Sequence, residues 1–187
     1  MDVFAQHAFD PPLGVAALER AARSYGFGFD CGIAWREGLL DSHGRRMLCR
    51  FDAPGAAALR EALRRRGAAV QALWAGTIRT VSWPPPGPRA PPSAGGTPVL
   101  AERSFHGPAA PDELHALEAA CAWCFEAHRV RLVGMLVSDD LDRIVYLCRA
   151  PDTESVRTAL RQAGAGLDAV WSYRVVASTP AAGAAAL

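Results

Sequence analysis

The chain has 187 residues, a formal net charge of +1 and hydrophobic residues at half of its positions, so it can bury a core as one domain or as two small ones. No apolar run reaches the roughly 18 residues of a membrane helix, and the N-terminus lacks the basic start and apolar segment of a secretory signal. We therefore expect a cytoplasmic protein with no membrane partner, and the near-zero charge gives no general attraction to nucleic acid.

The first half of the chain predicts strand, helix, strand, strand, helix, strand. Residues 3–9, 33–40, 45–51 and 70–81 have strand-like patterns, and helical three-four spacing begins at Leu13. A second helix is predicted from Pro54, where the missing N–H costs nothing, to Gly67, which suits the left-handed residue after a helix. Residues 1–81 are therefore predicted to form one ferredoxin-like unit.

The second half repeats this order. Strands are predicted at 99–105, 130–137, 142–148 and 167–176, and helices at 111–128 and 151–163. Residues 82–98 contain seven prolines, which favour an extended linker. The small-residue tail 177–187 is predicted to be disordered. Residues 99–176 are therefore predicted to form a second ferredoxin-like unit.

A direct repeat supports this division. Residues 53–74 and 150–171 agree at ten of twenty-two positions without a gap. The matches include a proline, a glycine and a tryptophan at fixed separation: Pro54 and Pro151, Gly67 and Gly164, Trp74 and Trp171. A repeat of this kind indicates one supersecondary unit used twice.

Each predicted sheet has two unlike faces. One side of a strand in each half is apolar and should face the helices: Met47, Cys49 and Phe51, and Ile144, Tyr146 and Cys148. The opposite sides are mixed: Arg46, Leu48 and Arg50, and Arg143, Val145 and Leu147. The predicted fold is therefore α+β, with two ferredoxin-like βαββαβ units packed as an intramolecular pseudo-dimeric α/β barrel whose interior is partly polar. Such a chain would be a monomer or a homo-oligomer of this pseudo-dimer.

Several segments resemble a known family. These are Cys49-Arg50-Phe51-Asp52-Ala53-Pro54, Ser138-Asp139-Asp140, the run from Tyr146 to Asp152, the opening Glu102-Arg103-Ser104-Phe105, and the spacing from Arg157 to Gly164. They resemble small bacterial ferredoxin-like proteins of largely unassigned function, one branch of which is described as nickel-binding. The resemblance implies paired units that form a dimeric α/β barrel. Where that family often has a histidine, this chain has Glu37 and Gly134.

The candidate metal ligands lie mainly in two equivalent hairpin turns. They are Glu37, Asp41, His43, Asp139 and Asp140, because imidazole and carboxylate suit a divalent transition metal such as nickel. The same residue types are ordinary turn formers, so a structural role is the alternative. Apart from such a metal, no cofactor is expected.

The candidate small-ligand residues are charged groups near the predicted barrel interior: His7, Arg46, Glu102, Arg103 and Arg143. If His7 and Arg103 face the interior, a ligand anion would be held strongly there. Pairing with nearby acids is the alternative for these two residues. Arg46 and Arg143 could clamp a carboxylate or join the two sheets by salt bridges.

The cysteines favour packing over chemistry. Cys121 and Cys124 have the spacing of a metal or redox pair, but both fall on the apolar stripe of a predicted helix. An odd total of five cysteines does not suggest a disulfide framework.

Three functions are compatible with these patterns. The first is a protein that binds a small ligand or a transition-metal ion in or near the barrel interior. The second is a cofactor-independent enzyme of oxygenase or isomerase type acting on a hydrophobic substrate in the cavity. The third is a protein-interaction module.

Overall fold

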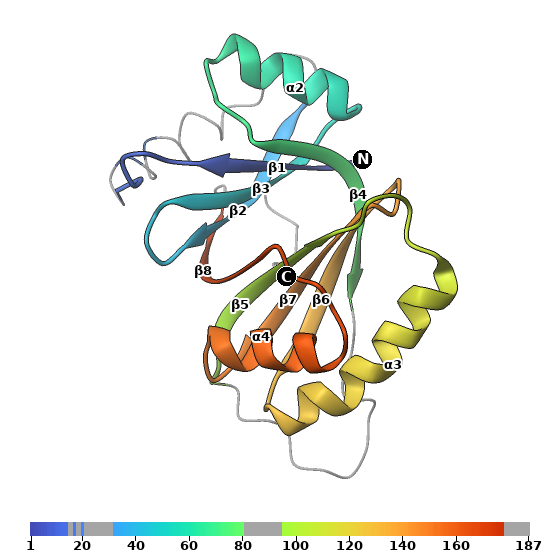
Figure 1. The fold of residues 1–187 in the computed structure, drawn as a ribbon. Coiled ribbons are helices and arrows are strands. Elements are labelled where there is room, and N and C mark those ends of the chain that lie inside the picture. Colours follow the sequence, from blue (N-terminus) through green and yellow to red (C-terminus); the bar gives the residue numbers. More distant parts are fainter. Residues whose placement is uncertain (15–16, 18–19, 21–31, 81–94, 178–187) are drawn as a thin grey trace. The chain divides into compact units, whose positions relative to one another are not determined.

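The computed structural model describes all residues except 15–16, 18–19, 21–31, 81–94 and 178–187 (Figure 1). The described residues form eight strands: β1 (Asp2–Ala8), β2 (Ala34–Asp41), β3 (Arg46–Asp52), β4 (Ala72–Thr80), β5 (Thr97–Ser104), β6 (Arg131–Ser138), β7 (Arg143–Ala150) and β8 (Ala169–Ala177). They also form three helices: α2 (Ala56–Arg65), α3 (Pro111–Ala127) and α4 (Thr153–Gln162). Within the described part of the chain, no helix combines the length and the apolar character needed to cross a membrane. The predicted helix after Leu13, most of the linker and the tail lie outside the described residues.

The chain divides into two compact units. Unit 1 contains residues 1–75 and the described residues from Arg174 onward, and unit 2 contains Gly76–Tyr173. Strand β4 crosses the boundary between these two units, because the two halves of the strand pair with different neighbours. The predicted boundary between residues 81 and 82 lies outside the described residues.

The sheet of unit 1 has the order β4, β1, β3, β2, with every described pair antiparallel. The first half of β4 pairs with β1, and Phe4 lies opposite Trp74 in this pairing. Strand β2 contains a bulge between Trp35 and Glu37, after which Glu37 lies opposite Arg50 of β3. A bulge of this kind changes the side to which the following residues point.

The sheet of unit 2 has the same order in its own elements, β8, β5, β7, β6, again antiparallel. The second half of β4 pairs with β6, so that Gly76 lies opposite Ser138. A bulge between Leu132 and Gly134 occupies the same place as the bulge of β2. The elements β5, α3, β6, β7, α4 and β8 complete the ferredoxin-like βαββαβ order in this unit.

The repeated helices α2 and α4 end in the same way. Gly67 and Gly164 adopt positive φ angles of 69° and 81°, which glycine tolerates without strain. Their amides and those of the next residues bond back to carbonyls of the last helical turn, which closes each helix as predicted. The starts differ from the prediction, because α2 begins at Ala56 with Gly55 as its N-cap, so Pro54 precedes the helix.

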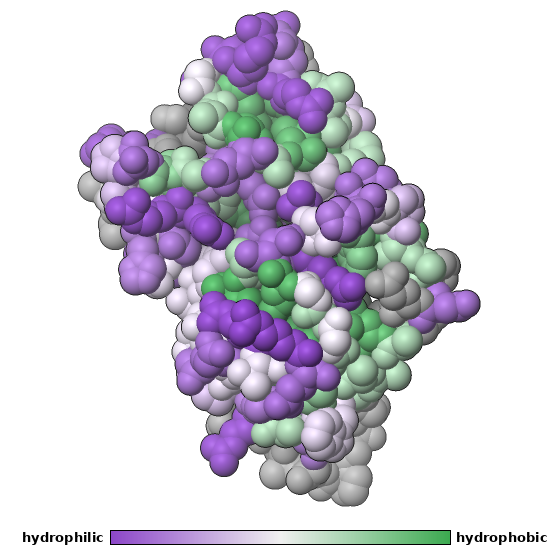
Figure 2. Space-filling model, viewed as in Figure 1, coloured by the Kyte–Doolittle hydropathy of each residue, from purple (hydrophilic) through white to green (hydrophobic). Residues whose placement is uncertain are grey.

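One face of each sheet packs against helices. In unit 1, Met47, Cys49 and Phe51 form a buried cluster with Leu59 and Leu63 of α2. The outer surface of α2 is hydrophilic, and hydrophobic atoms lie directly beneath it (Figure 2). The matching cluster of unit 2 contains Ile144, Tyr146 and Cys148 of β7 together with buried residues of α3 and α4. The prediction of which strand residues face the helices is therefore confirmed.

Candidate functional site

The candidate site is built on the second face of each sheet, which we define as the face turned away from the helices. Side chains alternate along a strand, so the residues between the members of the helix-side cluster point to this second face. In β5, Val99 and Ala101 belong to the helix-side cluster, whereas Leu100 and Glu102 alternate with them and do not belong to it. Glu102 is therefore placed on the second face of unit 2.

One row of side chains crosses the whole sheet of unit 2. Leu100 lies opposite Trp171 on one side and opposite Leu147 on the other, and Leu147 lies opposite Gly134. We call these four residues the Trp171 row. Trp171, Leu100 and Leu147 are all buried. The row is thus apolar and ends at a residue without a side chain.

The buried carboxylate beside this row is that of Glu102. Glu102 is 8% exposed, and its Oε1 accepts a hydrogen bond of 2.8 Å from Nε1 of Trp171. A carboxylate in an apolar setting is costly unless hydrogen bonds compensate it, and the indole N–H supplies one.

Gly134 lies at the other end of the Trp171 row. A Cβ placed there would have one neighbour among the described residues within 4 Å, the carbonyl oxygen of Arg79 at 3.3 Å. The nearest described neighbour of this position, apart from Val133 and Met135, is therefore backbone and not a side chain.

Unit 1 carries a different row at the equivalent place. Phe4 lies opposite Trp74 and opposite Arg50, and Arg50 lies opposite Glu37. We call these four residues the Trp74 row. The rings of Phe4 and Trp74 are stacked, with centroids 5.7 Å apart and an interplanar angle of 27°. The row therefore changes from aromatic to charged across the sheet.

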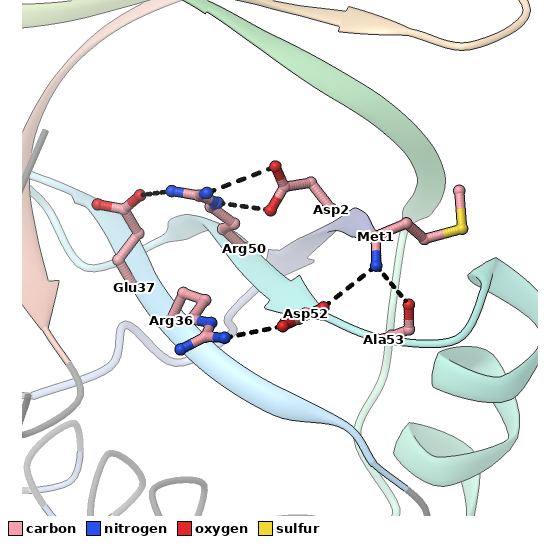
Figure 3. Close-up of polar contacts among 7 residues, drawn as sticks. All are labelled: Met1, Asp2, Arg36, Glu37, Arg50, Asp52 and Ala53. Atoms are coloured by element: carbon pink, nitrogen blue, oxygen red, sulfur yellow. Dashed lines mark hydrogen bonds and ion pairs between the residues drawn. The ribbon is translucent and has the colours of Figure 1, made fainter. Parts of the chain in front are cut away.

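Arg50 is held between two carboxylates (Figure 3). Its Nε lies 2.8 Å from Oδ1 of Asp2 and its Nη2 lies 3.4 Å from Oδ2, while its Nη1 lies 3.3 Å from Oε1 of Glu37. The side chains of Arg50 and Asp2 are each 28% exposed and that of Glu37 is 17% exposed. Burial lowers and the two carboxylates raise the pKa of Arg50, with a net raised value, so the guanidinium is charged.

The end of the same sheet carries a second polar cluster around Asp52 (Figure 3). The amine of Met1 donates to Oδ1 of Asp52 at 3.1 Å and to the carbonyl oxygen of Ala53 at 3.0 Å. Nη2 of Arg36 donates to Oδ2 of Asp52 at 2.7 Å. The hydrogen bond from Arg36, followed by that of the amine, lowers the pKa of Asp52. These contacts join the ends of β1, β2 and β3.

His7 and Arg103 do not lie on the second faces. His7 alternates in step with Val3 and Ala5, which belong to the helix-side cluster of unit 1. Its Nδ1 lies 2.8 Å from the carbonyl oxygen of Ala69, and burial lowers its pKa. Arg103 is in step with Val99 and Ala101, and its guanidinium lies 4.2 Å from the ring centre of Phe105. The pleat of their strands therefore turns both side chains toward the helix side of their sheets.

The two arginines at the start of β3 and β7 are less enclosed than a ligand clamp requires. Arg46 is exposed, and Arg143 is partly exposed. The backbone amide of each bonds to a side chain at the end of the preceding strand. The backbone amides at these two positions therefore close the two hairpins in the same way.

The predicted metal ligands belong largely to hairpin closure. Oδ1 of Asp41 accepts hydrogen bonds from the amides of Arg45 and Arg46 at 2.6 and 2.9 Å. In unit 2 the equivalent residue is Ser138, whose Oγ accepts from the amide of Arg143 at 3.0 Å and donates to Oδ1 of Asp142 at 3.0 Å. Asp41 thus performs in one hairpin what Ser138 performs in the other.

The remaining predicted ligands of the hairpins are exposed. His43 lies in the first hairpin, and Asp139 and Asp140 lie in the second. The pKa of Asp140 is lowered, mainly by hydrogen bonding within the turn. Glu37, by contrast, pairs with Arg50. Among the described residues, no three His, Cys, Asp or Glu side chains are arranged to hold a metal ion. The nickel hypothesis stays a prediction, which calorimetric titration would test.

The cysteines of the described chain lie in the helix-side clusters. Cys121 and Cys124 are buried beside Cys148 in the cluster of unit 2, and Cys49 is buried in unit 1. Burial raises the pKa of the Cys49 thiol to about 12 and also raises that of Cys148. The thiols of Cys49 and Cys148 are therefore poor nucleophiles, in agreement with the packing role favoured by the sequence.

Asp2, Arg50, Gly134 and Trp171 were not among the predicted site residues, although the sequence had placed Arg50 on the mixed face of its strand. The tryptophans were visible only as markers of the repeat. Which residues share a row depends on the pairing of strands far apart in the chain and on the two bulges. A sequence pattern with period two indicates a face but not the register between strands.

Comparison with known proteins places the fold but not a family. No protein-family model and no curated protein matches the sequence. The structure is similar to that of an anthrone oxidase-like protein, with a TM-score of 0.53 and 11% identity, over 99% of this chain and 96% of the other. Two weaker similarities have TM-scores below one half. One is to "Putative Chlorite dismutase TA0507" (0.49, 10% identity, 95% and 94% coverage) and the other to a "Putative monooxygenase" of Fusobacterium nucleatum (0.40, 8% identity, 93% and 90% coverage). The chain is an α+β protein whose ferredoxin-like fold is shared with the anthrone oxidase-like structure.

Proposed function

We propose that this protein is an enzyme that removes a proton from a hydrophobic small molecule, with Glu102 as the proton acceptor. The observation that carries the proposal is the buried carboxylate of Glu102 next to the apolar Trp171 row. A general base must lie within reach of a bound carbon or oxygen acid in a site from which water is largely excluded. Apolar surface with one oriented polar group is the usual composition of a small-molecule site.

We also propose that the two units pack as an intramolecular pseudo-dimeric α/β barrel, with the second faces inside. Support comes from the composition of these faces, since Leu48, Val145 and Leu147 are buried without belonging to the helix-side clusters. An apolar sheet face is stable only when another layer covers it. The similarity to the anthrone oxidase-like structure over nearly the full length of both chains supports the same arrangement.

The proposed chemistry needs only side chains of this chain in its first step. Glu102 accepts the proton of an acidic C–H or O–H group, which leaves the electron pair on the substrate as an enolate or phenolate. Trp171 positions the carboxylate through its hydrogen bond to Oε1. An isomerase returns the proton to another atom, whereas an oxygenase lets the anion react with molecular oxygen. The same first step thus serves both reaction types of this class.

Anthrone is a suitable first probe, because it is a planar ketone with an acidic C–H group and it appears in the name of the similar structure. The test follows proton loss and oxygen uptake with wild-type protein and the Glu102→Gln variant. We expect the variant to lose a factor of about 100 to 10,000 in rate. Glu126→Gln, which changes an exposed glutamate of the same unit, should keep the wild-type rate.

Two outcomes would contradict the catalytic role. One is a Glu102→Gln variant that is folded and as active as wild type. The other is binding of anthrone by the wild type with no turnover above the rate in buffer, which would favour a ligand-binding protein. Loss of stability without loss of rate would assign the contact between Glu102 and Trp171 to folding alone.

A further inference from the structure

The second face of unit 1 carries three charged side chains that the fold itself does not require. The two units provide an internal comparison, because the same strands and the same bulge recur in both. The repeat aligns Arg50 with Leu147 and Glu37 with Gly134, and the pairing of the first strands aligns Asp2 with Pro98. Unit 2 thus has uncharged residues at the three positions equivalent to Asp2, Arg50 and Glu37.

Partly buried ion pairs contribute little net free energy to the stability of a sheet. Removing charged groups from water costs free energy that mutual attraction often only balances, and apolar residues of similar volume commonly do as well. Leu147 in unit 2 is an apolar residue at this very position and is buried. Stability alone therefore does not explain why unit 1 has Asp2, Arg50 and Glu37 at positions where unit 2 has uncharged residues.

The contacts of Arg50 indicate which part of the cluster is available to a ligand. The 2.8 Å bond from Nε to Asp2 has the length of a charge-assisted hydrogen bond, whereas the contacts of Nη1 and Nη2 are 3.3 and 3.4 Å. A guanidinium has five N–H donors, and the described residues engage three of them. The Nη end is thus weakly held, and the side chain is 28% exposed.

We propose that the Nη end of Arg50 is a binding site for a neutral hydrogen-bond acceptor, such as the carbonyl oxygen of an apolar ketone. Asp2 neutralises and orients the guanidinium from the Nε side. Glu37 adds a second negative charge, so the three side chains together carry a net charge of −1. This charge disfavours a carboxylate ligand, while the N–H donors of Arg50 disfavour a cation. A neutral acceptor satisfies both conditions.

The site is distinct from the one proposed around Glu102, and it depends on residues of unit 1 alone. Its preference for a neutral ligand over a carboxylate depends on Glu37. The negative charge of this side chain repels an anion without contacting the ligand. Replacement of Glu37 by glutamine would keep the shape of the side chain and remove the charge that repels an anion.

The test uses three naphthalene probes that differ only in their head group: 2-acetylnaphthalene, 2-naphthoate and 2-naphthylmethylammonium. Calorimetry should show that wild-type protein prefers the neutral ketone over the carboxylate by about tenfold or more. Glu37→Gln should bind 2-naphthoate more tightly and so remove most of the difference in affinity between the ketone and the carboxylate. Glu61→Gln, on the exposed surface of α2, should leave the preference unchanged.

Arg50→Leu is the variant that removes the donor, and it introduces the residue that unit 2 already has at this position. It should remain folded by circular dichroism and lose the ketone site, with at least a tenfold weaker affinity. Unchanged ketone binding by folded Arg50→Leu would overturn the proposal. So would a Glu37→Gln variant whose preference between ketone and carboxylate equals that of wild type. Because Glu102→Gln leaves Arg50 intact, it should not alter this preference, which separates the two sites.

Discussion

Gly76 of β4 lies against the backbone of Val137 of β6, closer than any residue with a side chain could lie. A Cβ placed on Gly76 would be 2.4 Å from the carbonyl oxygen of Val137 and 3.2 Å from the Cα of Ser138. The atoms it would meet belong to backbone and not to flexible side chains. The absence of a side chain at this position therefore allows the second half of β4 to pair with β6.

We predict that Gly76→Ala destabilises the protein by about 2–3 kcal/mol, because strand β4 or β6 must move to relieve the contact. The measurement is the free energy of unfolding in urea. Gly166→Ala is the matched control, since among the described residues no heavy atom lies within 4 Å of the added Cβ. It should change stability by less than about 0.5 kcal/mol. Equal effects of both substitutions would show that the close contact is not limiting.

The N-terminus of α2 offers a stabilising substitution. Gly55 is its N-cap without a side-chain hydrogen bond, whereas the equivalent Asp152 caps α4 by accepting from the amide of Ser155 at 2.7 Å. The φ of Gly55 is 174°, which is extended backbone open to any residue, and the described residues leave space for a Cβ. Gly55→Asp should raise the free energy of unfolding by about 0.5–1 kcal/mol.

The cap of α4 supplies the control for this prediction. Asp152→Ala should lower the free energy of unfolding at neutral pH, because it removes the acceptor for the Ser155 amide. Bonding to Ser155 lowers the pKa of Asp152. The contribution of this carboxylate is therefore present above its ordinary pKa near 4 and is lost as the pH falls through its lowered value. A Gly55→Asp variant no more stable than wild type would contradict the capping argument.

His7 should make stability depend on pH. Burial lowers its pKa below the ordinary value of 6.5, despite the opposing bond to Ala69. Above pH 6.5 the histidine is neutral in both the folded and the unfolded state, so its contribution to stability is complete there. Below pH 6.5 the unfolded state takes up the proton first, and stability falls by at most about 1.4 kcal/mol per pH unit until the pH reaches the lowered value.

The matched variant is His7→Asn, whose amide nitrogen can replace Nδ1 as the donor to Ala69. Its overall stability will be lower because a buried ring is lost, so the informative quantity is the difference between its pH dependence and that of wild type. Urea unfolding at pH 7.5, 6.5 and 5.5 should show a shallower fall in the variant. Parallel curves would show that His7 does not titrate as its burial implies.

The hairpin residue Asp41 is predicted to act on stability. Asp41→Ala leaves the amides of Arg45 and Arg46 without their acceptor and should cost about 1–2 kcal/mol. Asp41→Ser should cost less, because serine at the equivalent position 138 already closes the second hairpin. Thermal unfolding in the presence and absence of nickel tests the other role. A nickel-dependent stabilisation of wild type that Asp41→Ala abolishes would identify this carboxylate as a metal ligand.

The order of the described elements, and the helix-facing sides of β3 and β7, could be predicted from the sequence alone. The repeat around Trp74 and Trp171, the glycines after α2 and α4, and the alternation from Met47 to Phe51 are local signals, and each arises from short-range geometry. Such signals specify an element of secondary structure independently of residues that are distant in the sequence. They also directed attention to Glu102, although as one of several charged candidates.

Which side chains lie next to one another depends on the pairing of strands in the folded chain. Arg50 and Glu37 became neighbours of Phe4 and Trp74 through pairings between separated strands, and a bulge in β2 turned Glu37 to the second face. The partition of β4 between two sheets depends on the close approach of Gly76 to Val137. Register between strands is set by long-range packing, and a shift of one residue reverses every side chain. A periodic sequence pattern therefore cannot specify the register.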